Sequence, residues 1–258
     1  MTLTERSARV AAAVKLHRHV GRRRAARFLA EGPNLVEAAL RRGLVSEVFA
    51  TEAALDRFGP MLADARVHLV TERAAKALSE TVTPVGLIAV CSTPETSLRD
   101  VLAGSPRLVA VAVDISEPGN AGTLIRIADA MGADAVVLAG HSVDPYNGKC
   151  LRASAGSIFS IPVVDGGEAA DAGGVVAALG EAGLQVLATT VDGEVSLEDV
   201  DLTASTAWLF GPEAHGLSIE LATMADHRVH IPMPGRAESL NVASAAAICL
   251  YQSARARS

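Results

Sequence analysis

Apolar runs that alternate with helical segments constrain the fold of this chain more than any other feature of its sequence. The run LVAVAV at 108–113 holds no polar residue, which is typical of a strand buried on both faces of a sheet. Similar runs, with helical patterns between them, recur at 134–140, 161–165, 184–190, 206–211 and 227–233. This alternation predicts a mostly parallel sheet flanked by helices, so the expected fold class is α/β.

The first hundred residues show a shorter version of the same alternation. Strands are predicted at 27–32, 45–51, 67–71 and 86–92, and helices at 33–43, 55–65 and 72–80. Pro33 favours the start of the first of these helices, and Gly43 favours its end. The polar, proline-containing stretch 93–106 is typical of a linker. We therefore expect two domains, a smaller α/β domain at 1–100 and a second domain at 101–258.

The N-terminal segment is strongly basic, although the chain as a whole is acidic. Residues 1–27 contain eight lysines and arginines against one acid, Glu5, whereas the whole chain has a net charge of −6. Such a segment favours docking to nucleic-acid phosphates, because bound cations release condensed counterions; an exposed, solvated helix face is an equally good interpretation. With 3% aromatic residues, a base-stacking surface is disfavoured, and RNA would be read mainly through its backbone and shape.

The sequence carries no recognisable targeting or metal-binding signal. The N-terminus lacks the apolar stretch and cleavage pattern of a signal peptide, and no apolar run is long enough to span a bilayer. Cys91, Cys150 and Cys249 have neither metal-ligand nor redox spacing, and an odd number of cysteines suits a reducing cytoplasm. We expect a cytoplasmic protein that binds no metal ion.

Three loops that follow predicted strands are rich in glycine, proline and small polar residues. Ligands of open parallel sheets bind beyond the carboxyl ends of the strands, where such loops converge. The first loop, in 114–134, leads into a helix expected at about 122–132, for which Asn120 can serve as the cap. One face of this helix should pack on the sheet, through Leu124, Ile127, Ala128 and Met131. Arg126 points the other way, either to bind an anion or to pair with Asp129.

The second loop, 207–218, places one carboxylate close to two glycines. Glu213 could act as a general acid or base, or it could accept hydrogen bonds from neighbouring main-chain N–H groups and fix the loop. We favour the second interpretation. His215 is expected only to line a wall, because no second metal ligand stands at a suitable spacing from it.

The third loop precedes a last helix rich in alanine, in VASAAAICLY at 242–251. Ser239 is the expected cap of that helix. Side chains as small as alanine would let the helix lie very close to main chain and to a bound ligand. Other common sites are not indicated, because the sequence has no GxGxxG after the first strand of a βαβ unit, no GxxxxGK(S/T) and no GxSxG elbow.

Together, and in this order, the three loops resemble the signature motifs of the SpoU (TrmH-type) RNA 2′-O-ribose methyltransferases of the SPOUT superfamily. NAGTLIR at 120–126 is similar to the family's Asn-x-Gly-x-x-x-Arg, GPEAHGLS at 211–218 to its Gly-x-Glu-x-x-Gly, and IPMPGRAESLNV at 231–242 to its third motif. The match spans roughly 107–251. The segment before it resembles the substrate-binding domain of the ribosomal-RNA branch. The whole chain resembles actinobacterial enzymes grouped with thiostrepton-resistance methyltransferases.

The resemblance implies a C-terminal trefoil knot, a homodimer formed through the knotted domain, and S-adenosylmethionine as the cofactor. In the family, the last helix also packs in the dimer interface. By motif matching, the expected catalytic residues are Asn120, Arg126, Glu213, Ser239 and Asn241. The expected cofactor-binding residues are Leu209, Gly211, Gly216, Ile231, Met233 and Leu240.

The implied reaction is an in-line attack of a ribose 2′-oxygen on the sulfonium methyl group. The family's motif assigns Arg126 to activation of the hydroxyl. Because arginine stays protonated in proteins, we favour stabilisation of the developing alkoxide, or a grip on the adjacent phosphate, over general-base catalysis. RNA contacts are expected from the basic segment and from the stretch KCLRASAGS, through Arg18, Arg22, Arg23, Arg24, Lys149 and Arg152. An exposed surface charge is the alternative for the last two.

Large-subunit ribosomal RNA is the expected substrate, because the N-terminal domain is typical of that branch of the family. The alternatives are a tRNA 2′-O-methyltransferase, a non-catalytic RNA-binding or ribosome-assembly factor, and a small-molecule enzyme on a nucleotide-binding sheet. The complete set of motif residues weighs against the non-catalytic factor. The missing dinucleotide fingerprint and the basic segment weigh against the small-molecule enzyme.

Overall fold

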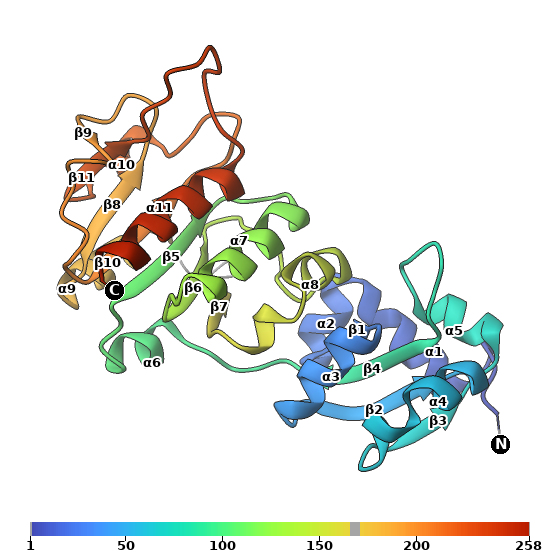
Figure 1. Ribbon diagram of the computed structural model, residues 1–258. Coiled ribbons are helices and arrows are strands. Elements are labelled where there is room, and N and C mark those ends of the chain that lie inside the picture. Colours follow the sequence, from blue (N-terminus) through green and yellow to red (C-terminus); the bar gives the residue numbers. More distant parts are fainter. Residues whose placement is uncertain (1, 166–170, 258) are drawn as a thin grey trace. The chain divides into compact units, whose positions relative to one another are not determined.

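The computed structural model describes residues 2–165 and 171–257, which form two compact units (Figure 1). The N-terminal unit comprises Met1–Glu95 together with Tyr146–Phe159, and the C-terminal unit comprises Thr96–Pro145 and Ser160–Ser258. In the sequence, Tyr146–Phe159 lies between two strands of the C-terminal unit, yet its contacts place it in the N-terminal unit. The boundary after Glu95 falls within the stretch 93–106.

The N-terminal unit is built on a four-stranded sheet of order β1-β4-β2-β3, in which β4 is antiparallel to β1 and β2, and β3 is parallel to β2. The strands are β1 (Arg27–Glu31), β2 (Val45–Ala50), β3 (Val67–Leu69) and β4 (Leu87–Ser92). The helices are α1 (Ala8–Val14), η1 (Lys15–His17), α2 (His19–Ala25), α3 (Pro33–Arg41), α4 (Glu52–Phe58), η2 (Gly59–Leu62), α5 (Glu72–Leu78), α8 (Gly148–Ser154) and η3 (Ser157–Phe159). The helix predicted at 55–65 is divided into α4 and η2, because Pro60 cannot donate a main-chain hydrogen bond.

The basic N-terminal segment is folded onto this sheet. Val10, Ala13 and Leu16 from α1 and η1 are buried in a cluster with α5 and three strands of the sheet. Cationic side chains such as Arg18 and Arg24 lie on the exposed side. The segment therefore has an exposed cationic face and an apolar underside, an arrangement that is compatible with both interpretations of its charge.

The C-terminal unit is built on a seven-stranded sheet of order β7-β6-β5-β10-β8-β11-β9, in which every pair of neighbours is parallel. The strands are β5 (Leu108–Val113), β6 (Ala135–Ala139), β7 (Val163–Asp165), β8 (Gln185–Thr189), β9 (Val195–Ser196), β10 (Thr206–Phe210) and β11 (His227–His230). The helices are α6 (Leu98–Ala103), α7 (Pro118–Ala130), α9 (Ala172–Glu181), α10 (Ile219–Thr223) and α11 (Val242–Ala256). The predicted α/β class and the predicted parallel sheet are confirmed.

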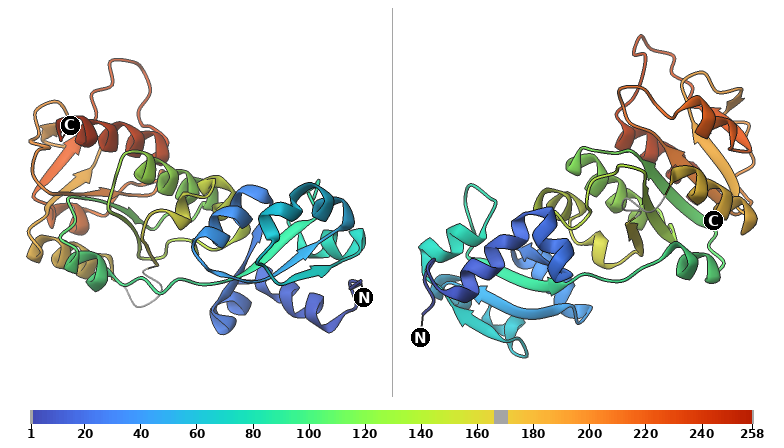
Figure 2. Two further views of the ribbon diagram at one scale, coloured as in Figure 1. Left: turned by 60° about the horizontal axis from the view of Figure 1, so that its bottom comes forward. Right: turned by 180° about the vertical axis from the view of Figure 1, so that it is seen from behind.

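Helices cover both faces of the seven-stranded sheet. On one face, α6, α9 and α10 pack against β5, β8 and β10 in a large apolar cluster. On the other face, α11 lies beside α7, with β5 and β10 beneath it (Figures 1 and 2). Alanines such as Ala243 and Ala246 form the buried side of α11, so the helix sits close to its neighbours. The contacts of α11 with α7 agree with the close approach to main chain expected from its composition, and the expected contact with a ligand stays a prediction.

Helix α7 begins four residues earlier than expected. Glu117 is its N-cap, because the Glu117 side chain accepts a hydrogen bond from the main-chain N–H of Gly119 at 3.1 Å. The prediction that Asn120 caps the helix is therefore wrong, and the Asn120 side chain serves another contact described below. The fully buried side of α7 includes Leu124, Ile125 and Ala128, and Ile127 is only partly buried. Packing against α11 as well as the sheet explains this wider buried side.

The described part of the chain contains three free cysteines, and all of them are buried. Burial raises the pKa of the Cys91 thiol to about 12, so this side chain stays protonated at neutral pH. Among the described helices, none combines the length and apolar character needed to cross a bilayer.

A buried hydrogen bond fastens α11 to the centre of the sheet. The Trp208 Nε1–H donates to Ser253 Oγ at 2.8 Å, and both side chains are fully buried. We expect Ser253→Ala to lower the free energy of unfolding by about 1–3 kcal/mol, because the indole N–H loses its acceptor where water cannot replace it. Urea denaturation measures this, with the exposed Ser244→Ala on the same helix as the control. Equal midpoints for the two variants would contradict the prediction.

Candidate functional site

A cavity of about 600 Å³ opens at the carboxyl ends of β8, β10 and β11. Its walls come from Thr189–Asp192 after β8, from Gly211–Leu217 after β10, from the segment 231–240 after β11, and from the start of α11. The last two loops are the second and third motif segments of the sequence. Their convergence at this edge of the sheet is the arrangement expected for a ligand site in an open parallel sheet.

One carboxylate oxygen ties all three motif segments together. Glu213 Oε1 accepts hydrogen bonds from Asn120 Nδ2 at 2.9 Å, from the Val242 main-chain N–H at 3.2 Å, and from Asn241 Nδ2. Asn241 Nδ2 also lies 3.2 Å from Asn120 Oδ1. A carboxylate oxygen suits this position, because all three partners are N–H donors. Glu213 therefore fixes the loops, as favoured from the sequence, and its partners include side chains as well as main chain.

Asn241 is the N-cap of α11. Asn241 Oδ1 accepts from the main-chain N–H groups of Ala243 at 3.0 Å and Ser244 at 3.3 Å. The prediction that Ser239 caps this helix is therefore wrong. Helical geometry starts only at Val242, where Glu213 holds both the Asn241 amide and the Val242 N–H. Ser239 instead lines the cavity with an exposed side chain.

Most residues expected to contact the cofactor line this cavity, namely Gly211, Gly216, Ile231, Met233 and Leu240. His215 and Ser239 line it as well. Leu209 is the exception and needs correction. Its side chain is fully buried in the apolar cluster with α9 and α10, because it points into the core on that face of the sheet, two residues before the loop begins at Gly211. Its carbonyl oxygen accepts from Thr189 Oγ1 at 2.8 Å, so Leu209 shapes the cavity from behind.

The loop after β10 folds tightly on itself. Gly216 has a φ of +66°, a conformation that favours glycine, and its N–H donates to the Pro212 carbonyl at 2.8 Å. A Cβ atom on Gly211 would lie 2.5 Å from the Leu217 nitrogen and 2.6 Å from the Gly216 carbonyl carbon. Glycine at position 211 is therefore required for the main chain to close into this wall of the cavity.

The wall after β8 was not anticipated from the sequence. Arg228 of β11 holds it through an ion pair from Nε to Glu194 Oε2 at 2.8 Å and a main-chain hydrogen bond to Glu194 Oε1 at 2.9 Å. That main-chain N–H is the main cause of a Glu194 pKa below its ordinary value. Arg228 and Asp192 also line the cavity. The position of this loop at the carboxyl end of a central parallel strand was the signal that could have found it.

Arg126 stands apart from the cavity. It lies on the exposed side of α7, and neither Arg126 nor Asn120 is among the described residues that line the cavity of its own chain. No ion pair joins Arg126 to Asp129, although the structure describes both side chains. A helix turn of 100° per residue places positions 120 and 126 about 120° apart around α7. The same helix thus directs Asn120 inward and Arg126 outward.

The residues expected to contact RNA differ in how far their side chains are exposed. Arg18, Arg23, Arg24 and Lys149 are exposed. Arg22 is only 7% exposed, and its guanidinium donates to the main-chain oxygens of Leu16 at 3.0 Å and His17 at 2.8 Å. We therefore correct the expectation for Arg22, which holds η1 against α2. Arg152 is partly exposed and lies beside Glu31 and Glu80.

Two family models match the chain. The one described as "SpoU rRNA Methylase family" matches residues 107–251, and the one described as "MRM3-like substrate binding domain" matches residues 7–89. The Bacillus subtilis (strain 168) protein named "23S rRNA (guanosine(2553)-2'-O)-methyltransferase RlmP" is 36% identical over 238 residues, which cover 92% of each chain.

Solved structures match the chain over almost its full length. The AdoMet-bound rRNA methyltransferase from Sinorhizobium meliloti has a TM-score of 0.87 and 29% identity, and the match covers 99% of this chain and 97% of that chain. The SpoU methyltransferase AviRb from Streptomyces viridochromogenes, in complex with the cofactor AdoMet, has a TM-score of 0.85 and 32% identity, with 98% of each chain covered.

Proposed function

The chain belongs to the SpoU rRNA methylase family, and on that premise we propose that it transfers a methyl group from S-adenosylmethionine to a ribose 2′-hydroxyl of large-subunit ribosomal RNA. The observation that carries this proposal is the cavity of about 600 Å³ whose walls are the second and third motif segments. Glu213, Asn120 and Asn241 hold these segments and the first motif in one cluster.

The residues that line the cavity fit S-adenosylmethionine. The volume of the cavity lies within the usual range for small-molecule sites, about 300–1,000 Å³. Ile231, Met233 and Leu240 offer apolar surface for an adenine ring, and Glu238 offers negative charge for a cationic ligand. Asp192 also lines the cavity, where it lies 3.9 Å from Arg228. The cofactor would supply a methyl group on a positively charged sulfur, which leaves as a neutral thioether.

The chain's own residues then have to position the ribose and stabilise charge on its 2′-oxygen. We assign Arg126 to the developing alkoxide or the adjacent phosphate, because a guanidinium donates several hydrogen bonds and stays charged. Asn120, held by Glu213 and Asn241, would orient the first motif. Ser239 and Asn241 would order the third motif at the edge of the cavity. The in-line geometry would account for much of the rate enhancement.

The proposal includes a trefoil knot and a homodimer in the C-terminal unit. Arg126 is exposed and does not line the cavity of its own chain, so a second copy would bring it to the site. Helix α11 packs beside α7 and exposes two large apolar side chains, Ile248 at 36% and Tyr251 at 52%. Such side chains suit a symmetric interface formed by these helices. Buried free thiols and an RNA substrate suit a cytoplasmic protein.

A direct test uses ribosomal RNA and tRNA from cells that lack this gene. The purified protein is incubated with methyl-labelled S-adenosylmethionine and either RNA, and 2′-O-methylated positions are mapped by their resistance to alkaline cleavage. We expect label at a position of large-subunit RNA that is also methylated in cells carrying the gene. Label in tRNA alone would favour the tRNA enzyme, and a protein that binds RNA without affinity for S-adenosylmethionine would favour the non-catalytic factor.

The exposed arginines of α2 should contribute to RNA affinity. We expect the double variant Arg23→Gln, Arg24→Gln to bind ribosomal RNA more weakly and with a flatter salt dependence. The slope of log affinity against log salt should fall by about 0.7–0.9 for each phosphate that the protein no longer neutralises. Fluorescence anisotropy over a salt series measures this slope.

The matched control is Arg41→Gln, Arg42→Gln, an adjacent exposed pair in the same unit. Arg22 is left out of the test because it is buried and structural. A slope equal to that of the wild type would remove α2 from the RNA-contacting surface.

A further inference from the structure

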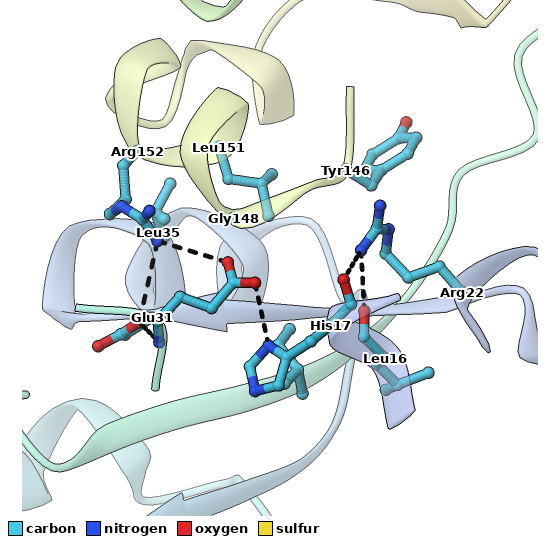
Figure 3. Close-up of a pocket in the computed structure, with 11 residues that line it drawn as sticks. Leu16, His17, Arg22, Glu31, Leu35, Tyr146, Gly148, Leu151 and Arg152 are labelled. Atoms are coloured by element: carbon cyan, nitrogen blue, oxygen red, sulfur yellow. Dashed lines mark hydrogen bonds and ion pairs between the residues drawn. The ribbon is translucent and has the colours of Figure 1, made fainter. Parts of the chain in front are cut away.

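A small cluster of charged side chains in the N-terminal unit surrounds Arg152. Figure 3 shows Arg152 reaching from α8 toward Glu31, which ends β1. Arg152 Nη1 lies 4.0 Å from Glu31 Oε2 and 3.8 Å from Glu80 Oε2. His17 Nδ1 lies 3.4 Å from the other oxygen of Glu80. Arg152 belongs to the stretch matched by the methylase model, whereas Glu31 and Glu80 belong to the stretch matched by the substrate-binding model.

The Glu31 carboxylate is fixed in place independently of Arg152. Its oxygens accept hydrogen bonds from Ser79 Oγ, from Thr81 Oγ1 at 2.7 Å, and from the Glu80 main-chain N–H at 3.2 Å. The Glu31 side chain is only 11% exposed, compared with 37% for Glu80. Its negative charge is therefore a rigid feature of the N-terminal unit, and it is weakly screened by solvent.

Helix α8 is also fixed against β1 by its neighbours. The Phe28 ring lies 4.8 Å from that of Tyr146 and 6.0 Å from that of Phe159, on either side of the helix in the sequence. A Cβ atom on Gly148 would lie 2.1 Å from Glu80 Oε2, so glycine in the first turn of α8 leaves room for the carboxylate. The position of the Arg152 backbone is thus set by packing, and its guanidinium by the two carboxylates.

The Arg152 guanidinium is held but not saturated. Both ion pairs are longer than a direct charge-assisted hydrogen bond of about 2.7–2.9 Å, and 35% of the side chain is exposed. A guanidinium has five N–H donors in a planar fork, which matches the oxygens of a phosphate. The two carboxylates lie near one nitrogen of the fork, Nη1, and the exposed part of the side chain leaves donors for such a ligand.

We propose that Glu31, assisted by Glu80, is a positioning residue that holds Arg152 in the orientation that grips a phosphate of the substrate RNA. This inference rests on the proposed function and adds a role for the N-terminal unit, which orients a side chain of the methylase stretch as well as binding RNA. Preorganisation of the guanidinium lowers the entropy lost when the phosphate binds. Glu31 is the main contributor because it is the less exposed and the better anchored carboxylate.

Glu31→Gln tests the proposal, because glutamine keeps an acceptor for Ser79 and Thr81 and removes the charge. We expect KM for ribosomal RNA to rise about three- to tenfold, within the range of coupling between neighbouring side chains. We also expect kcat and the affinity for S-adenosylmethionine to stay unchanged. Glu80→Gln should have a smaller effect and Glu31→Asp an intermediate one. The control is Glu47→Gln, which removes another partly buried, ion-paired carboxylate of the same unit.

A double-variant cycle separates positioning from a general effect on folding. In an Arg152→Ala background, Glu31→Gln should leave the KM for RNA unchanged, because no guanidinium remains to be oriented. An equal loss in both backgrounds would overturn the proposal, as would tighter RNA binding by Glu31→Gln, which would make Glu31 a competitor of the phosphate. A wild-type protein that neither binds nor methylates ribosomal RNA would overturn the proposed function itself, and this inference with it.

Discussion

Arg126→Ala is expected to reduce methyl transfer at least about 100-fold, the usual cost of removing one donor that stabilises charge in a transition state. Affinity for S-adenosylmethionine should remain that of the wild type, because the walls of the cofactor cavity come from the loops after β8, β10 and β11 and the start of α11, and not from α7, which carries Arg126. Single-turnover transfer to ribosomal RNA and calorimetric titration of the cofactor measure the two quantities. Arg99→Ala, at an exposed position of α6 in the same unit, is the matched control.

Arg126→Lys distinguishes the possible roles of the guanidinium. If Arg126 stabilises a developing negative charge, Arg126→Lys should keep part of the methyl-transfer activity that Arg126→Ala loses. Lysine keeps the positive charge but not the planar fork of N–H donors. Normal turnover of Arg126→Ala would contradict the assignment and leave Arg126 as an exposed surface charge.

Gly211→Ala is expected to weaken the binding of S-adenosylmethionine strongly. The added Cβ would lie 2.5 Å from the Leu217 nitrogen and 2.6 Å from the Gly216 carbonyl carbon, and neither main-chain atom can turn aside as a side chain could. Overpacking of this kind costs about 1–3 kcal/mol, or about 5- to 150-fold in a dissociation constant. The alanine side chain at position 211 therefore displaces the wall of the cavity that the loop after β10 forms.

Calorimetric titration of the cofactor and anisotropy with ribosomal RNA measure the effect of Gly211→Ala. RNA affinity should hold, because the exposed arginines of α2 lie in the other unit. Gly174→Ala is the matched control, since Gly174 lies in α9 and a Cβ there has nothing within 4 Å. Cofactor affinity equal to that of the wild type would show that the loop adapts and that Gly211 is not needed for the wall.

The two variants together test whether a second copy supplies Arg126. An Arg126→Ala chain keeps an intact cavity, and a Gly211→Ala chain keeps an intact Arg126. If the arginine acts across a two-fold interface, an equal mixture should recover about a quarter of wild-type activity, since half of the dimers are mixed and each has one complete site. A mixture as inactive as its components would place the arginine and the cavity within one chain.

Local pattern predicted the longer strands and several helices, but neither the short strand β9 nor the division of the helix expected at 55–65. The uninterrupted run 108–113 predicted a strand buried on both faces, and β5 is such a strand at the centre of a parallel sheet. Pro33 and Gly43 gave the bounds of α3 to within two residues. The position of the three motif segments, each directly after a predicted strand, was enough to place them at the carboxyl edge of that sheet. Which residues of one element are buried depends on the periodicity of its apolar residues, and this periodicity can be read directly from the sequence.

Pairing between distant residues could not be predicted in this way. The sequence predicted Ser239 as the cap of the last helix, but the cap is Asn241, whose amide is held by Glu213 from far away along the chain. Likewise Arg22 looked like its neighbours Arg23 and Arg24, yet only Arg22 turns inward to the carbonyls of η1. Charge and cap propensity describe which contacts a side chain can make. The parts of the same chain that fold next to it decide which of these contacts it makes.

The sequence by itself determined the α/β class, the parallel sheet and the residues of the three motifs, because each depends on the local spacing of apolar, glycine and polar residues. Only the tertiary structure decided that Glu213 joins those motifs through one oxygen, that Leu209 lies behind the cavity, and that α8 brings Arg152 to Glu31 and Glu80. These contacts join residues far apart in the chain, and their geometry is fixed by how the sheets and helices pack.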